Sequence, residues 1–166
     1  MNFEFATATR ILFGAGALRE AGKAAAEMRP GGLALVVTGV SSERAAPLLA
    51  QLEAYGLRHT EFTVESEPTL DLVRAGTQRA QEAPCDLIIG LGGGSALDTA
   101  KAIAILLTNG GDPLDYVEVI GGGQPLTQPP LPYLAIPTTA GTGAEVTRNA
   151  VIGSPEHKVK VSLGAR

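Results

Sequence analysis

The feature that most constrains the fold of this chain is a run of glycines that directly follows a short apolar segment. Residues 87–89 are Leu-Ile-Ile, and four of the next five positions, residues 90, 92, 93 and 94, are glycine. An apolar run without alternation predicts a parallel strand that is buried on both faces. Glycines lack a Cβ atom, so the turn after this strand can bring its backbone N–H groups close to a ligand.

A helix is predicted to begin directly after this turn. Ser95 occupies the expected N-cap position, and Asp98, three residues later, would complete a capping box. Residues 100–107 are apolar on nearly every side, which predicts a largely buried helix. Because unpaired N–H groups and the helix dipole converge at such an N-terminus, residues 92–95 are predicted to bind a phosphate group.

The pattern of the turn departs from two common phosphate-binding motifs. Its spacing, Gly90-x-Gly92-x-x-Ser95, has serine in place of the third glycine of the dinucleotide fingerprint. No Gly-Lys-Ser/Thr sequence closes it as in a P-loop. A tight structural connection between packed elements is the alternative interpretation, so the turn alone indicates a phosphate and no particular ligand.

Strand and helix patterns alternate along most of the chain. Strands are predicted at 33–38, 57–64, 86–91 and 133–137, and helices at 17–28, 43–55 (capped by Ser41 or Ser42), 70–82 (capped by Thr69) and from the glycine turn to near residue 109. This order is typical of an α/β fold with a Rossmann-like, doubly wound and mostly parallel sheet, which binds ligands at the carboxyl ends of its strands. Outside the sheet, the sequence predicts a short N-terminal strand or hairpin within 3–13, an irregular surface loop over 110–130, and paired strands at 146–152 and 159–163.

The composition fits one globular domain, and residues 1–166 are predicted to form a single domain. Hydrophobic residues make up 45% of the chain and aromatic residues only 4%, which suits helices packed on a parallel sheet. The net charge of −4 offers no basic field, so neither nucleic acid nor a membrane is expected as a partner. A single cysteine, Cys85, and an N-terminus without signal-peptide features predict a buried thiol and a cytoplasmic location.

A second polar segment follows the last predicted strand of the sheet. Residues 137–143 read Pro-Thr-Thr-Ala-Gly-Thr-Gly and carry three hydroxyl groups and two glycines. The strand before them should lie beside the strand of the glycine turn, so these hydroxyls and amides would meet a ribose or phosphate at the same edge of the sheet. An ordinary threonine–glycine turn is the alternative.

Taken together, the two segments resemble the iron-containing (group III) alcohol dehydrogenases. The matching residues are Gly92-Gly-Gly-Ser95 with Asp98-Thr-Ala-Lys101-Ala-Ile103, and Ile136-Pro-Thr-Thr-Ala-Gly-Thr-Gly-Ala-Glu-Val-Thr147. With the supporting matches elsewhere, the resemblance covers essentially the whole chain in the order of the family. A glycerol-dehydrogenase-like relative is a further alternative, because such proteins share the glycine turn but less of the threonine segment.

The resemblance implies an N-terminal nicotinamide-dinucleotide domain and assigns roles to its polar residues. The glycine turn would hold the pyrophosphate, the threonines would line the cofactor groove, and Asn149 and Lys160 would reach the nicotinamide ribose. The predicted cofactor-binding residues are Gly39, Ser41, Gly92, Gly93, Gly94, Ser95, Asp98, Thr138, Thr139, Thr142, Asn149 and Lys160. A plainer interpretation makes Asp98 a helix cap that forms an exposed i,i+3 pair with Lys101.

The residue after the first buried strand of the sheet bears on the choice of cofactor. Many family members have an aspartate where this chain has Gly39. An acid there would bond the 2′-hydroxyl of the adenosine ribose and repel a 2′-phosphate. Without it, Ser41, Ser42 and Arg44 are placed to contact that phosphate, so the predicted cofactor is NAD(P), with NADP(H) tolerated and favoured. Arg44 as a merely exposed helix residue is the alternative.

The metal ligands of the family, an aspartate and several histidines, belong to a helical C-terminal domain downstream of these residues. His59 and His157 are the only histidines here, and both are interpreted as structural or solvated. A catalytic metal needs about three converging protein ligands. No catalytic residue and no metal ligand is therefore predicted in this chain, and Fe²⁺ or Zn²⁺ is expected only in the full-length parent.

Two functions remain open from the sequence. In the first, the chain is the cofactor-binding half of a metal-dependent alcohol dehydrogenase, possessing no activity alone and present as a fragment, a cleavage product or the product of a truncated gene. The parent would transfer hydride between a small alcohol and NAD(P)⁺, giving an aldehyde or ketone. In the second, the chain is a stand-alone, non-catalytic nucleotide-binding module. A homo-oligomer, in this family commonly a dimer, is expected in the first case.

Overall fold

The computed structural model describes residues 9–164. Its helices and strands follow one another as η1 (Ala17–Glu20), α1 (Ala21–Met28), β1 (Leu33–Gly39), η2 (Ser42–Ala45), α2 (Ala46–Ala54), β2 (Arg58–Val64), α3 (Leu70–Glu82), β3 (Leu87–Gly92), α4 (Gly94–Asn109), α5 (Pro113–Tyr116), β4 (Tyr133–Pro137), β5 (Ala150–Ser154) and β6 (Val159–Leu163), where η marks a 3₁₀ helix. Within this part of the chain, every helix is too short or too polar to span a membrane.

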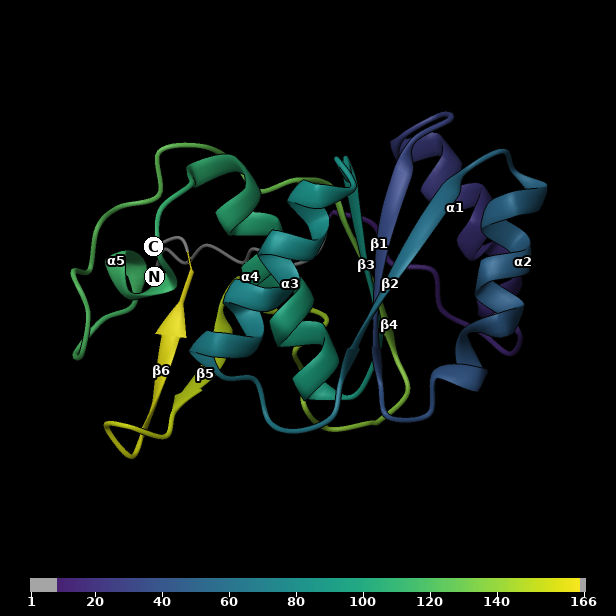
Figure 1. The fold of residues 1–166 in the computed structure, drawn as a ribbon. Helices are drawn as coiled ribbons and strands as arrows, with labels where there is room; N and C mark the ends of the chain where they lie inside the picture. Colours follow the sequence, from purple (N-terminus) through teal and green to yellow (C-terminus); the bar gives the residue numbers. More distant parts are fainter. Residues whose placement is uncertain (1–8, 165–166) are drawn as a thin grey trace, which may run out of the picture.

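Four strands form one parallel sheet in the order β2-β1-β3-β4. Helices α1 and α2 cover one face of this sheet, and α3 and α4 cover the other (Figure 1). This arrangement confirms the predicted Rossmann-like α/β fold. Because the chain turns from β1 towards β2 and from β3 towards β4, its connections diverge between β1 and β3, where doubly wound sheets bind their ligands.

The two central strands are buried on both faces, which explains why their sequences do not alternate. In β1, Ala34 and Val36 pack into the core formed with α1 and α2. Their neighbours Leu35 and Val37 pack into the core formed with α3 and α4. Every residue of β3 is buried as well. A strand between two helical layers gains from apolar side chains at every position, and the sequence of β1 reflects this.

Helix α4 is buried along most of its length, and every residue from 96 to 106 is buried. One side of the helix packs on the sheet through Ala100, Ile103 and Ala104. Another side carries Ile105 and Leu106 and packs against the antiparallel hairpin of β5 and β6 (Figure 1). The predicted buried helix and the predicted pair of C-terminal strands are both confirmed. The hairpin explains why α4 is buried, because it covers the side of the helix that faces away from the sheet.

Two predicted helix starts have different outcomes. Thr69 is the N-cap of α3, and its Oγ1 accepts a hydrogen bond from the N–H of Leu72 at 3.2 Å. The prediction for the helix at 43–55 is wrong in detail, because it begins as the 3₁₀ turn η2 and no side-chain hydrogen bond from Ser41 caps it. Pro47 lies in the first turn of α2, where its missing N–H costs nothing.

The predicted N-terminal strand is wrong in the part that the structure describes. Residues 9–13 form no strand, and the side chains of Ile11 and Phe13 are 59% and 99% exposed. The alternating pattern shows which residues favour a half-buried strand, but no other strand among residues 9–164 pairs with this segment. Residues 3–8 of the prediction lie outside the described part of the chain.

The loop predicted over 110–130 contains one turn of helix, α5, that the sequence analysis missed. Asp112 caps this turn and forms a capping box with Asp115. The guanidinium of Arg74 in α3 donates to both carboxylate oxygens of Asp112, at 2.6 and 2.8 Å, and so ties α5 to α3. A four-residue helix is too short to show a periodic pattern, so only its cap could have indicated it.

Cys85 is buried as predicted, and burial raises the pKa of its thiol to about 11. The protonated thiol therefore contributes stability below the thiol pKa of the unfolded chain, and this contribution is lost as the pH rises through the folded value. At pH 8 we expect iodoacetamide to alkylate the native chain roughly 100-fold more slowly than the chain unfolded in urea. Equal alkylation rates, followed by mass spectrometry, would show that the thiol is accessible and ordinary.

Candidate functional site

The candidate site lies where the carboxyl ends of β1, β3 and β4 meet. Residue partners across the sheet are Thr38 and Leu91 between β1 and β3, and Gly92 and Pro137 between β3 and β4. A Cβ atom on Gly92 would lie 3.5 Å from the backbone nitrogen of Gly39. The ends of the two central strands are thus in direct contact, and both carry glycine at the point where the sheet connections diverge.

The glycine turn is shorter than predicted, because α4 begins at Gly94 with Gly93 as its N-cap. The prediction of Ser95 as the N-cap is therefore wrong. The first helical hydrogen bond runs from the N–H of Leu97 to the carbonyl of Gly93 at 3.1 Å. The N–H groups of residues 94–96 precede this bond, and no side chain caps them. An uncapped helix start of this kind offers its N–H groups and its dipole to an anion.

The threonine segment lies directly over the glycine turn. A Cβ atom on Gly93 would lie 3.2 Å from Oγ1 of Thr139, and one on Gly94 would lie 3.4 Å from Cβ of Thr142. The N–H of Thr138 donates to the carbonyl of Gly92 at 2.9 Å and extends the pairing of β3 with β4. The structure thus brings the two sequence motifs together, and the absence of side chains on Gly93 and Gly94 lets the threonines approach the turn closely.

Asp98 and Lys101 do not form the helix cap and the exposed surface pair of the plainer interpretation. Because α4 begins at Gly94, Asp98 lies one turn inside the helix and cannot complete a capping box at its start. The pair is also buried and not exposed, since the two residues are 8% and 6% accessible. The ammonium of Lys101 donates to Oδ1 of Asp98 at 3.2 Å, so the i,i+3 contact exists within the protein interior.

Lys101 reaches beyond its own helix. It donates to Oγ1 of Thr147 at 3.1 Å and to the carbonyl of Asn149 at 2.6 Å. Burial lowers the pKa of Lys101, while the charges of Asp98 and Glu145 act in the opposite direction. One carboxylate oxygen of Glu145, Oε2, is buried without a hydrogen-bond partner in the described part of the chain. A small polar cluster therefore lies beneath the threonine segment.

Tyr133, at the start of β4, joins the wall of this cluster. Its hydroxyl donates to the carbonyl of Leu97 at 3.2 Å. Burial raises the pKa of the Tyr133 hydroxyl, and the nearby carboxylates of Asp98 and Glu145 add to that effect. Neither Tyr133 nor Glu145 was predicted from the sequence, in which the one available signal was a lysine within an otherwise apolar stretch of helix.

The remaining predicted residues lie around this centre or outside it. Gly39 has nothing within 4 Å of the position where its Cβ atom would stand, and Ser41 is exposed nearby. Asn149 is exposed, although its carbonyl is bound by Lys101. The ammonium of Lys160 on β6 forms an exposed ion pair with Glu67, at 2.8 Å from its Oε2. The structure places Lys160 on Glu67 and gives it no contact with the glycine turn.

The histidines form no metal centre with their surroundings. The ring of His59 bonds to Glu53 at 3.2 Å, and the ring of His157 bonds to the hydroxyl of Ser154 at 2.8 Å. Within residues 9–164, no group of three or more His, Cys, Asp or Glu side chains is arranged to hold a metal ion. The described residues therefore do not fit a bound iron or zinc ion.

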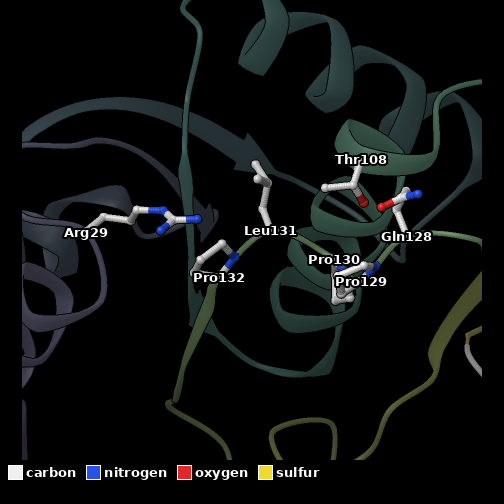
Figure 2. Close-up of a pocket in the computed structure, with 7 residues that line it drawn as sticks. All are labelled: Arg29, Thr108, Gln128, Pro129, Pro130, Leu131 and Pro132. Carbon is white, nitrogen blue, oxygen red and sulfur yellow. The ribbon is translucent and has the colours of Figure 1, made fainter.

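A pocket of about 440 Å³ lies elsewhere on the molecule (Figure 2). It is lined by Arg29, Thr108, Gln128 and residues 129–132. These residues end α1, lie near the end of α4 or precede β4, so the pocket is at the amino ends of the strands. The pocket and the glycine turn thus lie at opposite edges of the sheet. An α/β fold of this type binds its dinucleotide at the edge with the carboxyl ends of the strands, which is not the edge of the pocket.

Comparison with known proteins agrees with the two motifs. Residues 8–166 match the family model described as iron-containing alcohol dehydrogenase. The chain is 37% identical over 164 residues to choline dehydrogenase of Bacillus subtilis (strain 168), covering 96% of this chain and 40% of that protein. It spans about two fifths of the length of the curated relatives that it matches over nearly all of its residues.

Solved structures agree in fold as well as in sequence. A 1,3-propanediol oxidoreductase is 32% identical with a TM-score of 0.88, covering 99% of this chain and 43% of that one. A sulfoacetaldehyde reductase from Bifidobacterium kashiwanohense, solved in complex with NAD⁺, is 28% identical with a TM-score of 0.85, covering 99% and 43% of the two chains. Since the family model matches nearly the whole sequence and these structures share its fold, the chain belongs to the iron-containing alcohol dehydrogenase family.

Proposed function

We propose that this chain binds a nicotinamide dinucleotide across the carboxyl ends of β1, β3 and β4, as the cofactor-binding part of a metal-dependent alcohol dehydrogenase. The observation that carries the proposal is the contact of Thr139 and Thr142 with the positions above Gly93 and Gly94. Glycine at both positions keeps side-chain atoms out of the space between these threonines and an uncapped helix N-terminus. A pyrophosphate needs such a space, with backbone N–H groups that point into it.

The proposed roles follow from these positions. Gly92, Gly93, Gly94 and Ser95 hold the pyrophosphate, and Thr138, Thr139 and Thr142 line the groove in which the cofactor lies. Asp98 lies near the pyrophosphate, Asn149 and Lys160 belong to the nicotinamide end, and Gly39 and Ser41 belong to the adenosine end. For Lys160 this role requires its exposed ion pair with Glu67 to break, or its ammonium to contact Glu67 and the cofactor together. Either change costs little free energy, because such pairs are weak in water.

The dinucleotide would supply the hydride chemistry between an alcohol and an aldehyde or ketone. The chain's own contribution is to bind and orient the cofactor. Because residues 9–164 do not fit a metal ion, no catalytic step is assigned to iron or zinc here. We therefore infer that the 166-residue chain turns over no alcohol by itself, and that the substrate is met by residues of the longer parent protein.

The NAD⁺ complex of the related sulfoacetaldehyde reductase supports a dinucleotide as the ligand. We further propose a cytoplasmic homo-oligomer. The exposed apolar run of Ile11, Leu12 and Phe13, which are 59%, 44% and 99% accessible, supports self-association through this segment.

Substitution of Gly94 tests the proposed binding site. We expect Gly94→Leu to raise the dissociation constant of the nicotinamide dinucleotide by about tenfold or more, because the added side chain would occupy the proposed pyrophosphate site. Gly94→Ala should have a smaller effect, since its Cβ atom would be in ordinary contact with Thr142 at 3.4 Å. Titration of NADH or NADPH, followed by nicotinamide fluorescence, measures both.

The matched control is Ala50→Leu, which adds similar bulk on the exposed surface of α2. This variant should bind the dinucleotide like the unsubstituted chain. The proposed function is contradicted if the unsubstituted chain binds neither cofactor, or if Gly94→Leu binds as tightly as the control.

Gly39 tests the proposed preference for the phosphorylated cofactor. The open space at its Cβ position and the exposed Arg44 nearby favour NADP(H), because no acid repels the 2′-phosphate. We expect NADPH to bind more tightly than NADH, and Gly39→Asp to weaken NADPH by about tenfold or more through like-charge repulsion. Arg44→Ala should weaken NADPH and leave NADH unchanged.

Competitive titration of the two cofactors measures this preference at one ionic strength. Equal or tighter binding of NADH by the unsubstituted chain would show that Gly39 does not select the phosphorylated form. Such a result would leave the proposed dinucleotide site itself intact.

A further inference from the structure

Lys101 is a buried cation whose three N–H donors all have acceptors. An ammonium group has three donors and no acceptor. One donor goes to Asp98 within α4, and the other two go to Thr147 and to the carbonyl of Asn149. Burying a charge is costly unless it is paired and hydrogen-bonded, and here both conditions hold. Its contacts therefore join α4 to a segment nearly fifty residues further along the chain.

The segment that Lys101 holds is the one that follows β4 and carries the threonines. Residues 138–149 form no regular helix or strand. At its start, the N–H of Thr138 is bonded to the carbonyl of Gly92. At its other end, the side chain of Thr147 and the carbonyl of Asn149 are bonded by Lys101. Thr139 and Thr142 lie between these two attachments.

The interior of the segment has few hydrogen bonds of its own. The N–H of Val146 donates to the carbonyl of Gly143 at 3.1 Å, and the N–H of Ala144 donates to the hydroxyl of Thr142 at 3.4 Å. The Thr147 hydroxyl also contacts the carbonyls of Ala144 and Asn149, each at 3.4 Å. All of these are local contacts that fix turns and not the position of the segment on the sheet. The distance of the threonines from the glycine turn therefore depends on the attachments at the two ends.

We propose that Lys101 is a positioning residue that holds the threonine segment against the glycine turn and so sets the affinity for the dinucleotide without contacting it. This inference rests on the proposed function. Removing the ammonium would leave the Thr147 hydroxyl with only its long contacts of 3.4 Å to the carbonyls of Ala144 and Asn149 within the segment itself. The far end of the segment would then lose its hydrogen bonds to α4. The segment would then have to be ordered again when the cofactor binds, and that cost lowers affinity.

The test is a double-mutant cycle on NADPH binding by the full chain. Lys101→Met removes the charge and keeps the length of the side chain. Thr147→Val removes, at nearly constant volume, the hydroxyl that accepts from Lys101 and makes the two long contacts within the segment. We expect the dissociation constant to rise about tenfold in Lys101→Met and by a smaller factor in Thr147→Val. The double variant should bind no more weakly than Lys101→Met alone, because both substitutions break one link.

Two further variants separate positioning from a general loss of stability. Thr77→Val removes a buried hydrogen bond from Thr77 to the carbonyl of Val73 within α3, away from the threonine segment. It should lower the melting temperature and leave the dissociation constant unchanged. Lys101→Arg keeps the charge and several donors, so it should recover part of the affinity lost in Lys101→Met.

The outcomes distinguish this inference from the proposed function. Folded Lys101→Met with a dissociation constant within about twofold of the unsubstituted chain would overturn it, as would independent, additive effects of the two substitutions. If Lys101→Met does not fold, unchanged binding by Thr147→Val overturns the inference and weaker binding supports it. Failure of the unsubstituted chain to bind any dinucleotide would overturn the proposed function, and this inference with it.

Discussion

Helix α4 lies between the parallel sheet and the β5–β6 hairpin, and its burial on both sides constrains the position of the helix relative to both. Ile103 packs towards the sheet and Ile105 packs towards the hairpin, so the helix can neither rotate nor slide without opening a core. Its N-terminus is thereby held at the end of β3, with its first N–H groups uncapped. The position of the proposed anion site is thus set largely by the apolar packing of α4.

Burial of the same helix also explains its one internal cation. Lys101 lies on a helix that has no exposed side at that level, so its ammonium must find its acceptors within the protein. It finds them in Asp98 and in the segment that leads from β4 to β5. The hairpin, the threonine segment and the glycine turn are therefore connected through one helix, and this connection couples the fold to the proposed cofactor groove.

The sheet and its helices could be predicted because their signals are local. The apolar runs of β1 and β3, the Thr69 cap and the glycine turn each reveal an element within a few residues of sequence. The short helix α5 was missed because its stability comes from its cap and from Arg74, which is 38 residues before Asp112. The N-terminal strand was predicted from alternation alone, and alternation cannot supply a neighbouring strand.

In the candidate site, too, features with local sequence signals could be predicted and features that depend on tertiary contacts could not. That the glycine turn and the threonine segment meet could be predicted, since parallel neighbouring strands end at one edge of a sheet. The buried state of Lys101 could not, because its acceptors on Thr147 and Asn149 are 46 and 48 residues away. The pairing of Lys160 with Glu67, 93 residues apart, depends likewise on tertiary structure. The start of α4 shifted by two residues from the sequence-based cap, which changed the environment of Asp98 from a helix end to the interior.

The central claim is that a dinucleotide lies between the glycine turn and the threonine segment. The most direct measurement is a titration of the ¹⁵N-labelled chain with NADPH, in which backbone amide shifts are followed residue by residue. The claim predicts the largest shifts at residues 93–96 and 138–142, with no comparable change around Arg29 and Thr108 at the opposite edge of the sheet. Shifts centred on that opposite pocket, or no shifts at saturating cofactor, would contradict it.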